Sequence, residues 1–221
     1  MQVTKTVTIV ATGVLTVNVS IPERGYAGVP VTLSASWDGI AVGPFVGTIT
    51  WGDGTSENIP RQSSKSISKN HTYATSGSYT AKVSISDEYT GSSGSGTDSI
   101  TIKVVLSALL SASPTSGDIP LAVSFLCSAA GGYLNYSWTL DPGDGSAPYS
   151  GTRTAEGPWT QAHTYTKLGT FTAKLTVTDA LGATIVTRAT ARAGLAAPGL
   201  PEAAAIIIPL VAGLALLRVK R

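Results

Sequence analysis

The sequence contains few of the residues from which catalytic and metal sites are usually built. Its 221 residues include one cysteine and two histidines, and only 13% of the residues are charged. The single cysteine, Cys127, cannot form a disulfide within the chain, and the apolar strand pattern around it predicts a buried structural thiol. Apolar cores must therefore stabilise the folded part without disulfides.

The charged residues that are present are dispersed along the chain. The formal net charge is +2, and Lys and Arg form no basic stripe of the kind that binds nucleic acid. No helical periodicity precedes the C-terminal tail. We therefore expect no nucleic-acid partner and no helical domain.

Alternation of apolar and polar residues dominates the rest of the sequence. A period of two predicts strands with one face on a core and the other in water. Clusters of Gly and Ser separate these runs, and we interpret one of them, residues 91–96, as a flexible hairpin tip. Many short strands joined by turns predict antiparallel β-sandwiches. The clearest runs are residues 29–35, 46–51, 79–85, 99–104, 171–177 and 184–188.

One set of motifs occurs twice, about 92 residues apart. Such a period indicates one small domain used twice. A catalytic group is normally needed once, whereas a framework has to be rebuilt in each copy, so we interpret the repeated residues as scaffold. The first copy has Trp51, Gly52, Asp53, Gly54, His71, Tyr73 and Asp87, and the second has Trp138, Gly143, Asp144, Gly145, His163, Tyr165 and Asp179.

Each repeated motif has a structural interpretation. Gly-Asp-Gly suits a tight turn, because glycine allows positive φ and the short carboxylate accepts turn N–H groups. Its alternative is a calcium site in which Asp53 joins Asp87, or Asp144 joins Asp179, although calcium needs more oxygen ligands than these. Each histidine is expected to fix a loop by a hydrogen bond, and each following tyrosine to tie a sandwich corner.

These motifs, in this order, resemble the PKD (polycystic kidney disease) domain. The resemblance implies two consecutive immunoglobulin-like sandwiches, which we expect at residues 14–105 and 106–194. Members of the family occur in surface proteins and as accessory modules of enzymes. No set of nucleophile, base and orienting group, and no acidic pair, can be assembled outside the repeated residues, so we expect the chain to be non-enzymatic. The resemblance also implies no obligatory cofactor, although some related modules bind calcium.

The C-terminal tail differs in composition from the rest of the chain. Residues 203–217 are uncharged, and Arg218, Lys220 and Arg221 follow them. The pattern predicts a membrane-spanning helix over residues 203–219, preceded by a stalk at 195–202, with the basic end inside and the β domains outside. The alternative is a helix buried in an assembly. Three sequons, at Asn18, Asn70 and Asn135, are possible glycosylation sites of an outward-facing domain.

The N-terminal residues read as an extra strand over residues 1–13. They match the closing strand of copy one (residues 97–103) and have no charged region followed by the apolar core of a secretory signal. Three explanations stay open. The strand folds back on copy one, it is donated to a neighbouring subunit such as a copy of the same chain, or it is left over from a longer protein.

The sequence therefore predicts a non-catalytic, membrane-anchored structural or adhesion protein, such as a surface stalk, spike or surface-layer component. The arrangement resembles archaeal surface proteins, and a viral spike or vertex protein is a close variant. The other class is a carbohydrate- or protein-binding module, in which Trp37, Tyr149 and above all Trp159, expected in a loop, would contact the ligand. A linker made rigid by calcium is the third.

Overall fold

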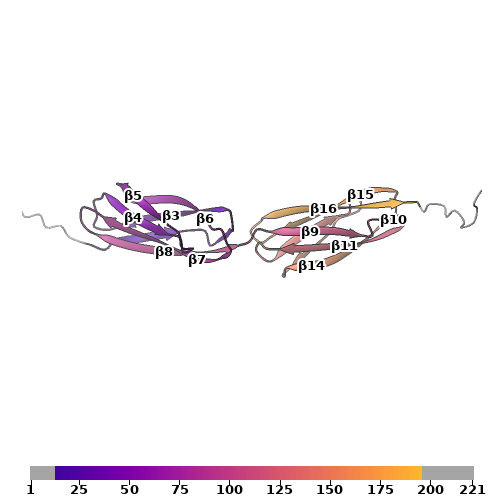
Figure 1. Ribbon diagram of the computed structural model, residues 1–221, viewed down its shortest axis with the longest axis horizontal. Coiled ribbons are helices and arrows are strands. Elements are labelled where there is room, and N and C mark those ends of the chain that lie inside the picture. The colour runs from indigo at the N-terminus through magenta and orange to yellow at the C-terminus, as the bar shows by residue number, and fades with distance from the viewer. Residues whose placement is uncertain (1–12, 196–221) are drawn as a thin grey trace, which may run out of the picture.

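The computed structural model describes residues 13–195, which form two β-sandwiches joined end to end (Figure 1). We call them domain 1, which contains strands β1 to β8, and domain 2, which contains β9 to β16. The strands of domain 1 are β1 (Thr16–Ser20), β2 (Arg24–Tyr26), β3 (Pro30–Asp38), β4 (Phe45–Thr50), β5 (Ser56–Gln62), β6 (Ser66–Thr72), β7 (Gly77–Asp87) and β8 (Ser93–Lys103). Those of domain 2 are β9 (Ser107–Ser113), β10 (Ser116–Asp118), β11 (Leu121–Ala130), β12 (Tyr136–Asp141), β13 (Tyr149–Arg153), β14 (Gly157–Tyr165), β15 (Gly169–Thr178) and β16 (Thr184–Gly194).

The two domains share one topology. Domain 1 packs a sheet of order β1-β3-β6 on a sheet of order β2-β8-β7-β4-β5, and domain 2 repeats it as β9-β11-β14 on β10-β16-β15-β12-β13. Neighbouring strands are antiparallel except for the short pairs β2–β8 and β10–β16. The predicted all-β, immunoglobulin-like sandwich fold is thus confirmed.

Each sandwich has its own core, built by the alternation seen in the sequence. In β3 the buried positions are Val31, Leu33, Ala35 and Trp37, and the residues between them are exposed. Cys127 occupies the equivalent inward row of β11 and is fully buried. Burial raises the pKa of its thiol to about 11, so it is a poor nucleophile at neutral pH.

The predicted flexible hairpin tip at residues 91–96 is wrong for most of its length. Only Gly91, with φ of 70°, and Ser92 lie in the connection, whereas Ser93 begins strand β8. A Cβ atom on Gly94 or Gly96 would overlap the backbone carbonyl oxygen of Leu15, just before β1, or of Val17 in β1, which crosses β8 here. These glycines therefore allow two sheets to approach closely, a role that glycine-rich strands often have.

Several predicted segments lie outside the described residues. They are the extra strand in residues 1–13, the stalk at 195–202 and the helix at 203–219, apart from residues 13 and 195 themselves. Within residues 13–195, no helix has the length and apolar character needed to cross a bilayer.

Candidate functional site

The Gly-Asp-Gly turn of domain 1 is tied to the opposite sheet by a histidine. Asp53 Oδ1 accepts hydrogen bonds from the backbone N–H (3.0 Å) and Oγ1 (2.6 Å) of Thr55, which closes the turn between β4 and β5. Its Oδ2 lies 2.7 Å from Nε2 of His71, which comes from β6. Burial opposes ionisation of Asp53, but these hydrogen bonds outweigh it and lower the pKa of the carboxyl.

Domain 2 rebuilds the same arrangement. Asp144 Oδ1 accepts from the backbone N–H (3.0 Å) and Oγ (2.6 Å) of Ser146, and its Oδ2 lies 2.9 Å from His163 Nε2. The hydrogen bonds again outweigh burial and lower the pKa of Asp144 to about 2. Both copies thus place the turn aspartate and the histidine in one contact, which we call the clamp.

A buried tyrosine completes each clamp. The hydroxyl of Tyr73 donates to the carbonyl of Trp51 (3.0 Å), and that of Tyr165 donates to the carbonyl of Pro142 (2.8 Å). Burial raises the pKa of both phenols to about 12. Each tyrosine therefore ties the end of the strand that carries the histidine to the start of the Gly-Asp-Gly turn, as a corner tyrosine does.

The two tryptophans of the repeated motif are not equivalent. The tyrosine contacts align Trp51 with Pro142, whereas Trp138 pairs with Val177 at the position where domain 1 has Gly47 opposite Ile85. Sequence proximity to Gly-Asp-Gly suggested one shared role, which is wrong. Trp51 stacks on His71 with ring centroids 4.4 Å apart, whereas Trp138 packs against Trp159 between the sheets.

The clamp aspartates do not meet the other repeated aspartates. Asp87 pairs with Phe45 at the start of β4, whereas Asp53 follows the end of β4. Phe45 and Thr50, the two ends of β4, are five residue steps apart, or roughly 16 Å of strand, so these two carboxylates cannot share one calcium ion. Among residues 13–195, no group of three or more His, Cys, Asp and Glu side chains is placed to hold a metal.

Asp87 instead organises the far end of domain 1. Its Oδ2 accepts from the N–H groups of Val42 (2.8 Å) and Gly43 (2.9 Å), and its Oδ1 from those of Tyr89 (2.8 Å) and Thr90 (3.0 Å). Against the opposing effect of burial, these four bonds lower the pKa of Asp87 to about 2. We call this end of each sandwich its head, and the end with the clamp its tail.

Asp179 has the same place at the head of domain 2, but one of its donors belongs to domain 1. Its carboxylate accepts from the N–H groups of Tyr133 (3.0 Å), Leu181 (2.9 Å) and Ala183 (3.0 Å) and from the hydroxyl of Tyr26 (2.5 Å). These bonds outweigh burial and lower the pKa of Asp179. Burial and the contact with Asp179 raise the pKa of Tyr26 far above its usual value.

A second tyrosine crosses the junction in the opposite direction. The hydroxyl of Tyr133 accepts from the N–H of Gly25 (3.2 Å) and lies 2.5 Å from the carbonyl oxygen of Thr101, both at the tail of domain 1. Its ring packs edge-on against Tyr26 and beneath the guanidinium of Arg24. The junction, visible at the centre of Figure 1, is therefore a hydrogen-bonded and packed contact.

The sequence-based reasoning missed Tyr26 and Tyr133. Neither belongs to a repeated motif, since each is needed only where the two domains meet. In the other copy, Asp118 occupies the place of Tyr26 and Val42 occupies the place of Tyr133. This difference between the two copies was the signal that the sequence offered.

The aromatic residues proposed as ligand contacts are engaged within the fold. Trp37 is only 3% exposed and belongs to the core, so its expected exposure is wrong. Trp159 lies in strand β14, not in a loop, and is half-buried beneath the Arg153 guanidinium, 4.6 Å from its ring. Tyr149 places its hydroxyl 3.1 Å from Nδ1 of His163.

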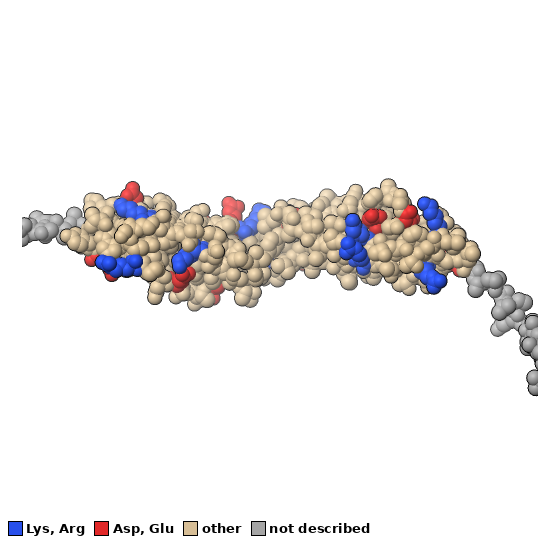
Figure 2. Space-filling view, turned by 90° about the horizontal axis from the view of Figure 1, so that it is seen from above, with Lys and Arg blue, Asp and Glu red and all other residues tan. Residues whose placement is uncertain are grey.

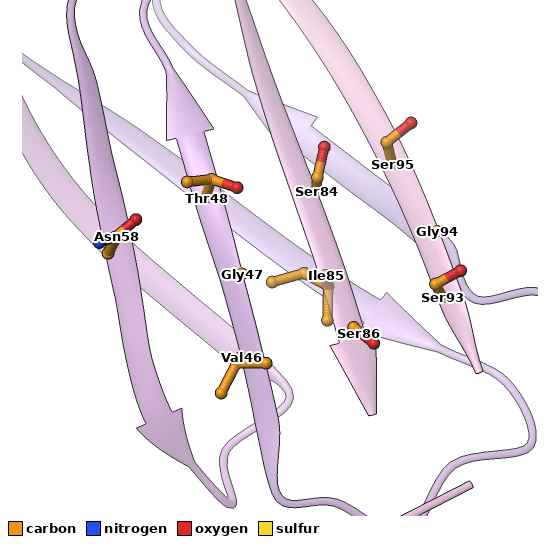
Figure 3. A pocket seen from close by; sticks show the side chains of 10 residues that line it. All are labelled: Val46, Gly47, Thr48, Asn58, Ser84, Ile85, Ser86, Ser93, Gly94 and Ser95. Carbon is orange, nitrogen blue, oxygen red and sulfur yellow. The ribbon is translucent and has the colours of Figure 1, made fainter. Parts of the chain in front are cut away.

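The surface offers a shallow groove and little charge. The groove, of about 560 Å³, lies on the outer face of the sheet formed by β5, β4, β7 and β8 in domain 1 (Figure 3). Its ten lining residues include no charged and no aromatic side chain: Val46, Gly47, Thr48, Asn58, Ser84, Ile85, Ser86, Ser93, Gly94 and Ser95. On the face shown in Figure 2, charged side chains are scattered along both domains and gather into no patch of one sign.

All three sequon asparagines are accessible. Asn18 lies on β1, Asn70 on β6, and Asn135 in the loop before β12, and each is exposed. Asn70 Oδ1 accepts a hydrogen bond from Thr32 (2.7 Å), whereas Asn135 adopts a positive φ of 75°.

Comparison with protein families found a match, which lies in the second sandwich. Residues 107–193 match the PKD domain family. The match covers the sandwich from β9 to β16, including the clamp of Asp144 and His163. Domain 1 shares the topology and the clamp of domain 2. The comparison with curated proteins found no match.

Solved structures resemble the chain in fold. An I-band fragment of titin has a TM-score of 0.54 at 9% identity, over 83% of this chain and 66% of that one. The PKD domain of an M14-like peptidase from a Thermoplasmatales archaeon has 24% identity and a TM-score of 0.36, over 39% and 91%. Fibronectin(III)-like modules of Clostridium thermocellum CbhA have 15% identity and a TM-score of 0.39, over 81% and 95%. The titin likeness supports the sandwich fold.

We predict that Asp53 stabilises domain 1 independently of calcium. Replacing it with alanine removes the turn and histidine contacts and should lower the free energy of unfolding by about 1–2 kcal/mol. Asp53→Asn keeps an acceptor oxygen for the turn and should lose less. Denaturant unfolding with calcium or with chelator measures both variants, and a loss that appears only with calcium would contradict the prediction.

We also predict a loss of stability in acid. The pKa of Asp144 in the folded chain is about 2, below the roughly 3.9 of an unfolded chain. Its stabilising effect is therefore complete above about pH 4 and is lost as the pH falls towards 2. Melting temperatures at pH 5 and pH 2.5 test this. Asp144→Asn should be less stable than the parent at pH 5 but should lose less on acidification, and an equal loss would exclude this carboxylate as a source.

Proposed function

We propose that this chain is a non-catalytic, membrane-anchored spacer or adhesion protein, in which two sandwiches form a rigid rod held away from a membrane. The observation that carries this proposal is the junction. PKD and immunoglobulin-like domains are generally non-catalytic modules, and the junction contacts give this pair a defined mutual geometry.

The junction contacts oppose bending in more than one direction. The Tyr26 hydroxyl bonds to domain 2 and the Tyr133 hydroxyl bonds to domain 1, so the two contacts cross. The N–H of Gly132 also donates to the carbonyl of Val104 in the connecting segment (2.8 Å). A bend would break at least one of these bonds and leave a buried polar group without a partner, which is costly.

The termini suit a spacer. The described part of the chain begins at one end of the rod and finishes at the other (Figure 1). In our proposal residues 203–219 cross the membrane and residues 195–202 form a stalk, so domain 2 lies near the membrane and domain 1 projects outward. The three exposed sequons would then be available for glycosylation on the outer side.

We expect Tyr133→Phe to loosen the rod without unfolding either domain. The variant keeps the ring packing but removes the hydroxyl contacts with Gly25 and Thr101. Single-molecule energy transfer between dyes at Ser63→Cys and Leu168→Cys should give a broader distance distribution than in the parent. Tyr89→Phe, at the free head of domain 1, is the matched control and should change nothing. An unchanged distribution for Tyr133→Phe would contradict the rigid rod.

The anchor is tested separately by deletion. A chain that lacks residues 201–221 should fold but no longer float with phospholipid vesicles in a density gradient, because the apolar segment is the proposed membrane contact. Circular dichroism verifies the fold. Flotation of the truncated protein would show that the sandwiches themselves bind lipid and would contradict the anchor.

A further inference from the structure

The head of domain 1 exposes four large apolar side chains, which we call the head patch. They are Val14 (84% exposed), Ile40 (67%), Val42 (72%) and Tyr89 (66%). The patch lies around Asp87 and Ser92, at the end of domain 1 that faces away from domain 2. Grouped apolar side chains on a rod tip are unusual because each one costs free energy in water.

Buried polar groups hold the head patch in place. The Asp87 carboxylate binds the N–H groups of both Val42 and Tyr89. The buried hydroxyl of Ser92 accepts from the N–H of Gly13 (3.0 Å) and donates to the carbonyl of Ile40 (2.8 Å). The Asp87 carboxylate and the Ser92 hydroxyl thus hold together residues 13–14, residues 40–42 and Tyr89. The patch is therefore an organised surface.

The equivalent surface of domain 2 is covered at one of its positions, although Leu181, in the place of Tyr89, stays 42% exposed. Tyr133 donates its N–H to Asp179 as Val42 does to Asp87, so these two residues occupy one structural position. Tyr133 is only 9% exposed because the tail of domain 1 packs over it, whereas Val42 has no cover among the described residues. In domain 2, the head of the sandwich therefore serves as a surface on which another part of the chain packs.

The nearest available cover is the chain's own N-terminal segment. Residues 1–12 join the patch through Gly13, which lies against Ile40. They carry apolar side chains at Val3, Val7 and Ile9. Twelve extended residues reach roughly 40 Å, and attachment at the patch gives an effective concentration of about millimolar or more.

The interior strands of the described sandwiches already have two neighbours each, so a strand from a second copy could add only at a sheet edge. Strand β7 already pairs with β4 and β8, and β15 with β12 and β16. Donation of residues 1–12 into either sheet interior would have to displace a strand. We infer that residues 1–12 dock across the head patch of their own domain 1. The inference does not depend on the membrane anchor.

Thiol labelling of the full chain tests this inference. The natural Cys127 is fully buried, so the parent chain gives the background rate with iodoacetamide. Val42→Cys should react about tenfold more slowly in the full chain than in a chain lacking residues 1–12, because a docked segment must open first. Leu168→Cys, 55% exposed at the tail of domain 2, is the control and should react equally in both.

Other outcomes overturn the inference. Equal rates for Val42→Cys with and without residues 1–12 would mean that the segment does not cover the patch. Protection that grows with protein concentration would assign the cover to a second copy. If the deletion unfolds domain 1, Ile9→Asp in the full chain replaces it. That variant should speed the labelling of Val42→Cys and of Tyr89→Cys, and unchanged rates would again overturn the inference.

Discussion

The Asp179 carboxylate is the group on which the arrangement of the two domains depends. A buried carboxylate is tolerated only when hydrogen bonds replace its hydration. Three of its donors are loop N–H groups of domain 2, and the remaining one is the Tyr26 hydroxyl of domain 1. Domain 1 is thus part of what keeps this charge solvated. Asp87 takes all four of its donors from its own domain, so this carboxylate needs no neighbouring domain to replace its hydration.

The repeat made the sandwich fold predictable from the sequence, because strand alternation and turn glycines act locally. The partners of Asp53 and His71 were not named in advance, since they come from different sheets. The tryptophans show the limit of motif matching: Trp51 and Trp138 are close to the same turn in sequence but occupy different positions on the strand. Gly94 and Gly96 show another, because their role depends on a strand about 80 residues away. The junction tyrosines were missed because they occur once.

The clamp resembles half of a catalytic triad, in which a carboxylate orients a histidine. In domain 2, hydrogen bonds within the framework engage the whole imidazole. In domain 2, Nε2 of His163 faces Asp144 and Nδ1 faces the hydroxyl of Tyr149, so both ring nitrogens have partners within the framework. The second carboxylate oxygen of Asp144 is occupied by Ser146. In domain 2 the pair therefore fixes a turn to a facing sheet, with both ring nitrogens engaged in that contact.

The path of the chain through each sandwich has a mechanical consequence. In domain 2 the chain enters at the head in β9 and leaves at the tail in β16, at opposite ends of the sandwich. A pull on the two ends of the rod therefore acts along these strands. Strand β9 is bonded to β11 from Ser107 to Ser113, and β16 is bonded along β15 from Thr184 to Ala193. The load is shared in shear by whole ladders of hydrogen bonds, so extension cannot open them one at a time as in a zipper.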